Sequence, residues 1–177
     1  MKAGITQITR VAIFAALVFI FSYFTSLLYN VNPSFFIVFA AGFAWGIWPG
    51  IGVGVIGFFL WSNFNPFGPA PFPLLLSQLL GISFSAIIGA FAARLPITFR
   101  RLNLNVIFIL ALSGLLCGLI FHLIVDIVDA YLFQPFWPRL IGGLLFSLIT
   151  IVSNAIIFPL LHPVLKLMID RGKMADQ

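Results

Sequence analysis

The sequence predicts an all-α membrane protein, a compact bundle of six transmembrane helices with the N- and C-termini in the cytoplasm. Of its 177 residues, 62% are hydrophobic and only 7% are charged, whereas soluble domains carry about 25% charged residues. The apolar residues also form long runs that short polar or proline-rich stretches separate. Such runs are typical of helices that cross a bilayer. We therefore expect residues 1–177 to form a single integral membrane domain.

The charged residues exclude several functions. The net charge is +5, but the nine lysines and arginines are scattered at the ends of apolar runs, where they orient a membrane protein rather than bind nucleic acid. The single cysteine, Cys117, provides neither a disulfide framework nor a thiolate metal site. There is no glutamate, HExxH, CxxC or phosphate-binding GxxxxGK[ST] sequence. We expect no enzyme, no bound metal, no cofactor and no ATPase site of its own.

The predicted helices span approximately residues 5–28, 34–48, 49–62, 73–94, 105–128 and 139–168. The second and third runs are separated only by Pro49, so they form either two spans or one kinked helix. Two spans place eight of the nine basic residues on the cytoplasmic side and leave only Arg139 opposite, which the positive-inside rule favours. These two short helices reach about 18–21 Å, so we expect them to borrow flanking residues or to be partly buried by neighbours.

The stretch from Gly46 to Gln78 predicts the mouth of a membrane-embedded pocket. A glycine-rich helix leads into a loop with four prolines, where Trp61, Asn63 and Asn65 provide aromatic surface and amide donors, and Gln78 lies near the start of the next helix. Such a loop suits the capture of a small, partly aromatic molecule. An ordinary interfacial loop with an aromatic belt would have the same residue types.

The fifth run carries a second group of candidate residues. Gly114, Gly118, His122 and Asp126 recur every four residues, and Asp129 follows on the same face. Ionisable groups within a bilayer are costly and usually mark a functional site. A structural alternative is that Asp126 or Asp129 pairs with Arg139 across the short loop that follows.

Two further helices contribute small or polar faces. In the sixth run, Asn154 lies on the same face as Gly143 and Ser147, and Pro159 and Pro163 are expected to distort its end. In the first run, Ala12 and Ala16 form a small-xxx-small face, which allows close helix contact.

Taken with the loop WSNFNPFGPAPFP, these features resemble the substrate-binding S components of energy-coupling factor (ECF) vitamin transporters, and the resemblance spans nearly the whole chain. It implies a bacterial or archaeal cell-membrane protein that binds a vitamin or related micronutrient with high affinity. It also implies two kinds of partner, a transmembrane scaffold subunit and two ATPase subunits. Ala12 and Ala16 would be the docking face. The implied substrate-binding residues are Trp61, Asn63, Asn65, Gln78, His122, Asp126 and Asn154.

The resemblance leaves the vitamin open. In the thiamin-binding branch a histidine on helix five and an asparagine on helix six contact the ligand, and His122 and Asn154 are placed accordingly. The glutamate that this branch uses on helix four has no counterpart, and Gln78 is nearest in kind. Two other functions are compatible with the sequence: a membrane scaffold of the rod-shape MreD type, and a self-contained small-solute carrier.

Overall fold

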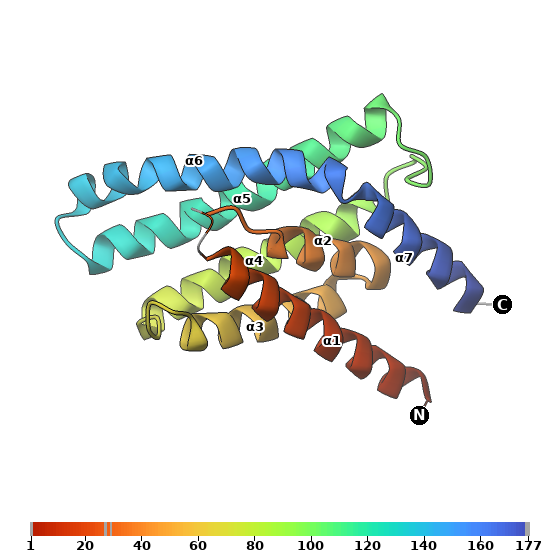
Figure 1. Cartoon of the computed structure of the whole chain (residues 1–177), viewed down its shortest axis with the longest axis horizontal. Coiled ribbons are helices and arrows are strands. Elements are labelled where there is room, and N and C mark those ends of the chain that lie inside the picture. Colours follow the sequence, from red (N-terminus) through yellow and green to blue (C-terminus); the bar gives the residue numbers. More distant parts are fainter. Residues whose placement is uncertain (1, 27, 29, 176–177) are drawn as a thin grey trace.

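The protein is all-helical in the computed structural model, which describes residues 2–26, 28 and 30–175, with side chains for 4–26, 28 and 30–171 (Figure 1). Within these residues there are seven helices and no strand. Their bounds are α1 (Lys2–Thr25), α2 (Ser34–Trp45), α3 (Ile47–Phe64), α4 (Phe72–Ala92), α5 (Leu104–Leu132), α6 (Phe136–Leu160) and α7 (His162–Ala175). The side chains of Lys2 and Lys173, used in the charge argument, lie outside the described ones.

Five of these helices are long and apolar enough to cross a membrane, namely α1, α3, α4, α5 and α6. Many large apolar side chains on them face outward, among them Phe24, Phe108 and Leu145. Exposure of such an apolar surface to water is unfavourable, whereas contact with lipid chains is not. The protein is therefore membrane-embedded. Helix α2 has only 12 residues, about 18 Å of rise, and is shorter than the others.

The helices from α1 to α6 alternate in direction, so both chain ends lie at the same end of the bundle (Figure 1). Helix α7 continues away from α6 at that end. Helices α3 and α4 both pack against α2, and α4 and α6 both pack against α5. The connections after α1, α3 and α5 lie at the opposite end.

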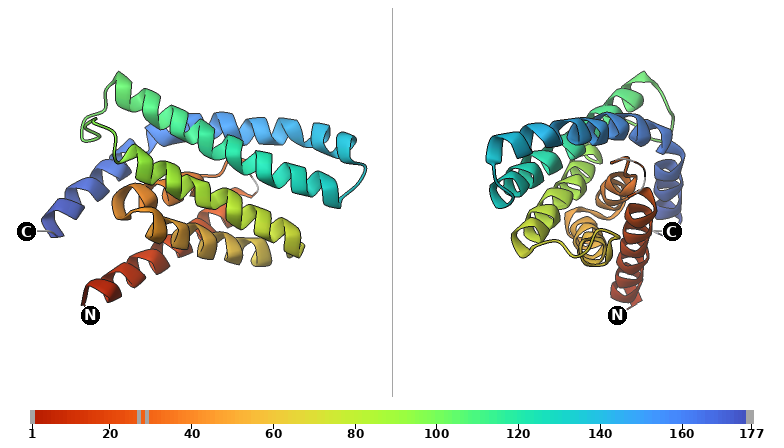
Figure 2. Two further views of the ribbon diagram at one scale, coloured as in Figure 1. Left: turned by 180° about the vertical axis from the view of Figure 1, so that it is seen from behind. Right: turned by 60° about the vertical axis from the view of Figure 1, so that its left-hand side comes forward.

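Helix α2 is the centre of the bundle, as the end-on view in Figure 2 shows. It contacts all six of the other described helices. Phe35, Phe36 and Phe39 are fully enclosed, and their rings pack against aromatic rings of α3, α5 and α6. Helix α2 therefore buries its short length in protein instead of in lipid, which removes the need for it to match the bilayer thickness.

Two glycines allow α2 and α4 to pack backbone to backbone. A Cβ atom added at Gly89 would lie 2.1 Å from the carbonyl oxygen of Phe39, and one at Gly42 would lie 2.1 Å from the carbonyl oxygen of Ala86. No side chain other than hydrogen fits at either position. This contact holds α4, which carries Gln78, against the central helix.

The break between the second and third helices lies at Gly46, not at Pro49 as the sequence predicted. Gly46 has φ of 91°, and Pro49 lies in the first turn of α3. A proline ring clashes with the carbonyl four residues earlier only if the helix is continuous, so a turn at Gly46 removes the clash. Gly50 packs on Gly42 and Gly54 on Val38, so α2 and α3 form an antiparallel hairpin instead of one kinked helix.

The predicted helix over residues 139–168 is two helices in the structure. Helix α6 ends at Leu160, and α7 begins at His162 after a change of direction at Leu161 (Figure 1). Pro163 lacks the N–H that a continuous helix would need there, and its ring would meet the carbonyl of Pro159. The distortion that Pro159 and Pro163 predict at this end is confirmed by the break at Leu161, whereas the separate helix α7 was not predicted.

His162 was assigned no role from the sequence. It is buried, and its Nε2 lies 2.8 Å from the carbonyl oxygen of Phe99 in the connection between α4 and α5. Nearby, Arg100 pairs with Asp170 of α7 at 3.3 Å. These two contacts fasten the start and the second half of α7 to that connection.

Candidate functional site

A cavity of about 200 Å³ lies beside α2, toward the end of the bundle where α3 and α5 end. Its lining comes from α1, α2, α3, α4, α5 and α6 and from the α1–α2 connection. Three of the seven predicted binding residues meet there: Trp61, Gln78 and His122. The other lining residues are Ser22, Thr25, Ser26, Asn30, Val31, Asn32, Phe35, Phe58, Phe121, Val125 and Thr150.

Aromatic rings form one wall of this cavity. Phe35 of α2, Phe58 of α3 and Phe121 of α5 contact one another edge to face, with ring centroids 5.0 to 6.2 Å apart. The ring of Trp61 lies 5.7 Å from that of Phe58. Edge-to-face packing fixes the orientation of each ring, so the wall presents flat, apolar surface in a rigid arrangement.

Gln78 brings a hydrogen-bond donor to the cavity, which the ring of Trp61 also lines. The Ser62 hydroxyl donates to Gln78 Oε1 at 2.6 Å, which fixes the orientation of the amide so that its nitrogen points away from Ser62. That nitrogen has no partner among the described residues. The buried Trp61 Nε1 also has none, and a buried donor without an acceptor costs about 1–3 kcal/mol.

His122 is held by a chain of hydrogen bonds that leads to α6. Its Nδ1 lies 3.0 Å from Oδ1 of Asp126 one turn along α5, and the Ser147 hydroxyl donates to the other oxygen of the same carboxylate. Because an ionised carboxylate only accepts, Nδ1 carries the proton. His122 Nε2 has no partner among the described residues, and His122 lines the cavity. Asp126 does not line the cavity and acts on it only through His122.

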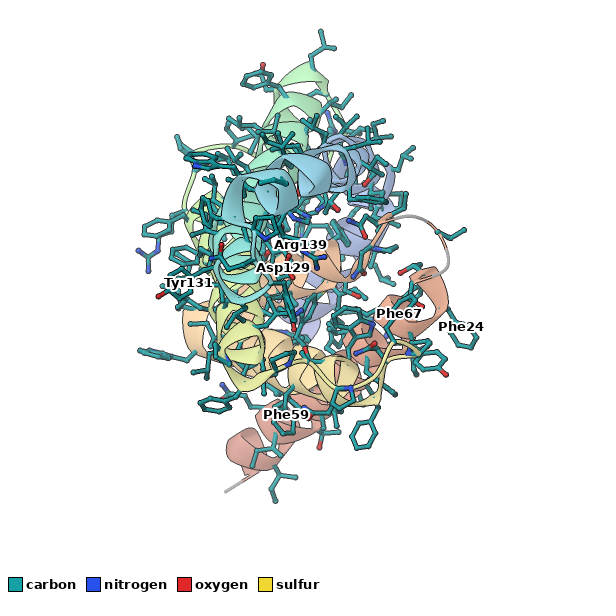
Figure 3. The ribbon with its side chains drawn as sticks, turned by 90° about the vertical axis from the view of Figure 1, so that its left-hand side faces the viewer. Phe24, Phe59, Phe67, Asp129, Tyr131 and Arg139 are labelled. Carbon is teal, nitrogen blue, oxygen red and sulfur yellow. The ribbon has the colours of Figure 1, made fainter. Side chains whose placement is uncertain are left out.

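Asp129, and not Asp126, pairs with Arg139. The guanidinium Nε and Nη2 atoms donate to the two carboxylate oxygens at 2.6 and 3.2 Å, and the two side chains lie together in Figure 3. The arginine side chain is 51% exposed and that of Asp129 is 25% exposed. The pair therefore closes the α5–α6 turn on the surface and is separate from the cavity.

Asn63 and Asn65 lie outside the cavity. Asn63 Nδ2 donates to the carbonyl of Phe59 on its own helix at 2.8 Å. Asn65 donates to the carbonyls of Ser62 and Gly68, and its own side-chain oxygen accepts from the Phe67 N–H. Asn65 thus closes the α3–α4 loop on itself, and the exposed Phe67 ring points away from the protein.

Asn154 is fully buried between α5 and α6 but does not line the cavity. An added Cβ at Gly114 would meet its backbone carbonyl at 2.3 Å, and one at Gly118 would lie 3.4 Å from its Nδ2. Neither the nitrogen nor the oxygen of its side-chain amide has a hydrogen-bond partner in the described part of the chain. The glycine face of α5 thus packs on the helix turn that carries Asn154.

The α1–α2 connection supplies lining residues that the sequence analysis did not name. Asn30, at φ of 66°, offers its carbonyl to the Thr150 hydroxyl of α6 at 3.0 Å. Asn32 accepts from the Ser34 N–H and donates to Ser22. This connection covers one side of the cavity. The run of polar residues between the first two apolar segments was the signal that could have identified it.

Ala12 and Ala16 lie on the outside of the bundle, in an apolar groove of about 670 Å³ between α1 and α3. Val11, Ala15, Trp48 and Ile56 are among the other residues of this groove. Ala12 and Ala16 are exposed, whereas Ala15 packs inward. The predicted docking face is therefore open in the isolated chain.

Among the described residues, no group of three or more His, Cys, Asp and Glu side chains could hold a metal ion. No family model matches the sequence, and no curated protein or solved structure is similar to it.

Proposed function

We propose that the protein is the membrane-embedded binding subunit for uptake of a vitamin or related small micronutrient, which it delivers to a transmembrane scaffold subunit driven by two ATPases. The observation that carries the proposal is the cavity in which Trp61, Gln78 and His122 meet. It combines a rigid aromatic wall with two side-chain nitrogens, Gln78 Nε2 and His122 Nε2, that have no partner among the described residues, as small-molecule sites do. No catalytic step is part of the proposed function.

The proposed topology has six passes, with both termini in the cytoplasm. The alternating directions of α1 to α6 support it (Figure 1). The basic residues Arg10 in the first half of α1, Arg94 and Arg100 between α4 and α5, and Lys166 in α7 support it too, because these segments belong to the end that holds the termini. In this topology the cavity opens toward the outside. Cysteine accessibility labelling tests it: positions 65 and 137 should react from outside and position 100 from the cytoplasm. Labelling of position 65 only from the cytoplasm would reject six passes.

The cavity favours a small, flat ligand with hydrogen-bond acceptors on one edge. Its volume of about 200 Å³ is below the usual range for drug-sized ligands, about 300–1,000 Å³. The rings of Phe58 and Phe121 would cover the ligand ring, while Gln78 would donate to its acceptors and His122 Nε2 would bind a polar edge. Among the described residues, no Asp, Glu, Lys or Arg side chain lines the cavity, so a ligand with a strong net charge would lack a counterion.

The groove beside Ala12 and Ala16 is the proposed docking face for the scaffold subunit. Small residues allow a partner helix to approach the backbone of α1 closely, which is how helices associate in lipid. The chain carries no phosphate-binding loop, so energy for uptake would come from the partner ATPases.

Mass spectrometry of small molecules that co-purify with the whole chain in detergent tests the proposed function. We expect one small heterocyclic compound in the parent protein. Gln78→Leu should weaken its binding roughly 2- to 10-fold, the value of one hydrogen bond. Gln134→Leu, the same change on an exposed turn, is the matched control and should retain the compound. If the parent is empty and binds no micronutrient tested, the proposed function is wrong.

A further inference from the structure

A second hollow lies on the opposite side of α2 from the cavity. Its volume is about 360 Å³, and every residue that lines it is apolar. Helix α2 forms the floor through Phe36, Ile37 and Ala40, while α1 and the α6–α7 segment form the walls. Helices α1 and α7 both contact α2, but within the described chain they do not contact each other. An open apolar groove therefore separates them, and the left-hand view of Figure 2 shows α1 and α7 apart from each other.

The change of direction after α6 creates this groove. Because α7 begins a new axis at His162, Val164 and Met168 turn toward α1 instead of continuing in line with Leu160. On α1, Phe14, Leu17 and Phe21 face them. These are large aromatic or branched side chains, which keep a partner helix at a distance, unlike the small residues that line the groove between α1 and α3.

One arginine on each wall extends the groove toward the chain ends. Arg10 is one turn before Phe14 on the same face of α1, and Arg171 is three residues after Met168 on the same face of α7. Both are exposed, and neither has an acidic partner among the described residues. Arg10 lies over the ring of Trp45 at 5.9 Å, which holds it near this end without neutralising its charge.

We propose that this groove binds one anionic phospholipid, with an acyl chain between α1 and α7 and the phosphate held by Arg10 and Arg171. A flexible hydrocarbon chain fills an irregular apolar groove that water would leave and a helix could not enter. The two unpaired guanidinium groups match a phosphate in charge and in hydrogen-bond geometry. The proposal requires only that the protein lies in a membrane, and does not depend on the micronutrient function.

Native mass spectrometry of the whole chain in mild detergent tests the site. The protein is incubated with an equimolar mixture of phosphatidylglycerol and phosphatidylcholine that have the same acyl chains. We expect one bound phosphatidylglycerol in clear preference. The double variant Arg10→Gln, Arg171→Gln should lower its retention roughly 25-fold, about fivefold for each basic residue at the membrane surface. Retention of phosphatidylcholine should fall much less, because its cationic choline already offsets the charge of the phosphate.

Two controls separate the site from general charge and from misfolding. The double variant Arg94→Gln, Arg101→Gln removes the same charge outside the groove and should keep the preference. Leu17→Trp fills the groove and should lower the retention of both lipids, whereas Leu123→Trp on the outer face of α5 should not. If Leu17→Trp does not fold, the comparison of the two arginine double variants alone tests the proposed site.

Three results would overturn the proposal. Equal retention of the two lipids by the parent protein would remove the headgroup site. An equal loss of preference in both arginine double variants would assign the preference to net charge. A dimer that Leu17→Trp dissociates would show that a second copy of the chain occupies the groove.

Discussion

Replacing Asp126 by asparagine tests the hydrogen-bond chain that holds His122 at the cavity. The carboxylate of Asp126 accepts from His122 Nδ1 at 3.0 Å and from the Ser147 hydroxyl. Asparagine has one carbonyl oxygen, so it can keep only one of these two bonds as an acceptor. Its NH2 group would instead donate to His122 Nδ1, which moves the imidazole proton to Nε2 and changes the polar group that faces the cavity.

The expected loss of stability follows from the bonds that change. Two hydrogen bonds to an ionised group contribute about 1.5–3 kcal/mol each, and the two neutral bonds of the variant contribute about 0.5–1.5 kcal/mol each. The difference is about 2–3 kcal/mol. The side chain of Asp126 is 23% exposed, and contact with solvent places the loss at the lower end, about 2 kcal/mol. For a chain of this size that lowers Tm by about 4–8 °C.

Asp129→Asn is the matched control, because it makes the same change one turn along α5. Asp129 pairs with an arginine that is 51% exposed, and exposed ion pairs contribute about 0–1 kcal/mol. We expect a Tm change of at most about 4 °C and no change in ligand affinity.

Thermal unfolding in detergent and the ¹⁵N spectrum of the imidazole measure the two effects of Asp126→Asn. The spectrum should show the proton on Nδ1 in the parent and on Nε2 in the variant. Affinity for the co-purified ligand should fall roughly 10- to 100-fold. Equal Tm values for the two asparagine variants, with an unchanged tautomer, would refute the proposed role of Asp126 in positioning His122.

Three further outcomes are expected. Gly89→Ala should lower the free energy of unfolding by about 3 kcal/mol or more, because its Cβ would lie 2.1 Å from the Phe39 carbonyl oxygen. Gly142→Ala should not destabilise the protein, because open space surrounds Gly142. Denaturant titration of both variants compares the two. Ala16→Trp should leave ligand binding intact and abolish uptake in cells, and normal uptake would remove the docking assignment. His162→Phe should lower Tm, because it leaves the buried Phe99 carbonyl unpaired at a cost of about 1–3 kcal/mol; an unchanged Tm would show that water satisfies that carbonyl.

Prolines show how far local sequence determined the helix boundaries. The prolines at 49 and 163 predict that a continuous helix is interrupted nearby, because a ring without an N–H cannot continue the ladder. They do not predict where the new helix begins, since a proline is tolerated anywhere in the first turn. The structure places the breaks at Gly46 and Leu161, two or three residues before each proline.

Composition alone determined that the chain is all-helical and membrane-embedded. Apolar runs of this length lie in lipid, where no water is present to form hydrogen bonds with the backbone. A helix satisfies its N–H and C=O groups within the segment itself. The spacing of three and four residues predicted that His122, Asp126 and Asp129 share one face of a helix, because residues at these spacings lie on the same side of an α-helix.

The choice of partner for each of these residues was decided only by tertiary structure. The sequence left both Asp126 and Asp129 open as partners of Arg139, yet the arginine reaches Asp129 and Ser147 reaches Asp126. The position of α6 along α5 sets these pairs. Likewise Asn154 shares a helix with Ser147 but is enclosed against the glycines of α5, away from the cavity. A periodic pattern in the sequence defines one face of a single helix. Contact between residues of two helices depends also on how each helix is rotated about its axis and how far it is shifted along the other, and both depend on packing across the whole bundle.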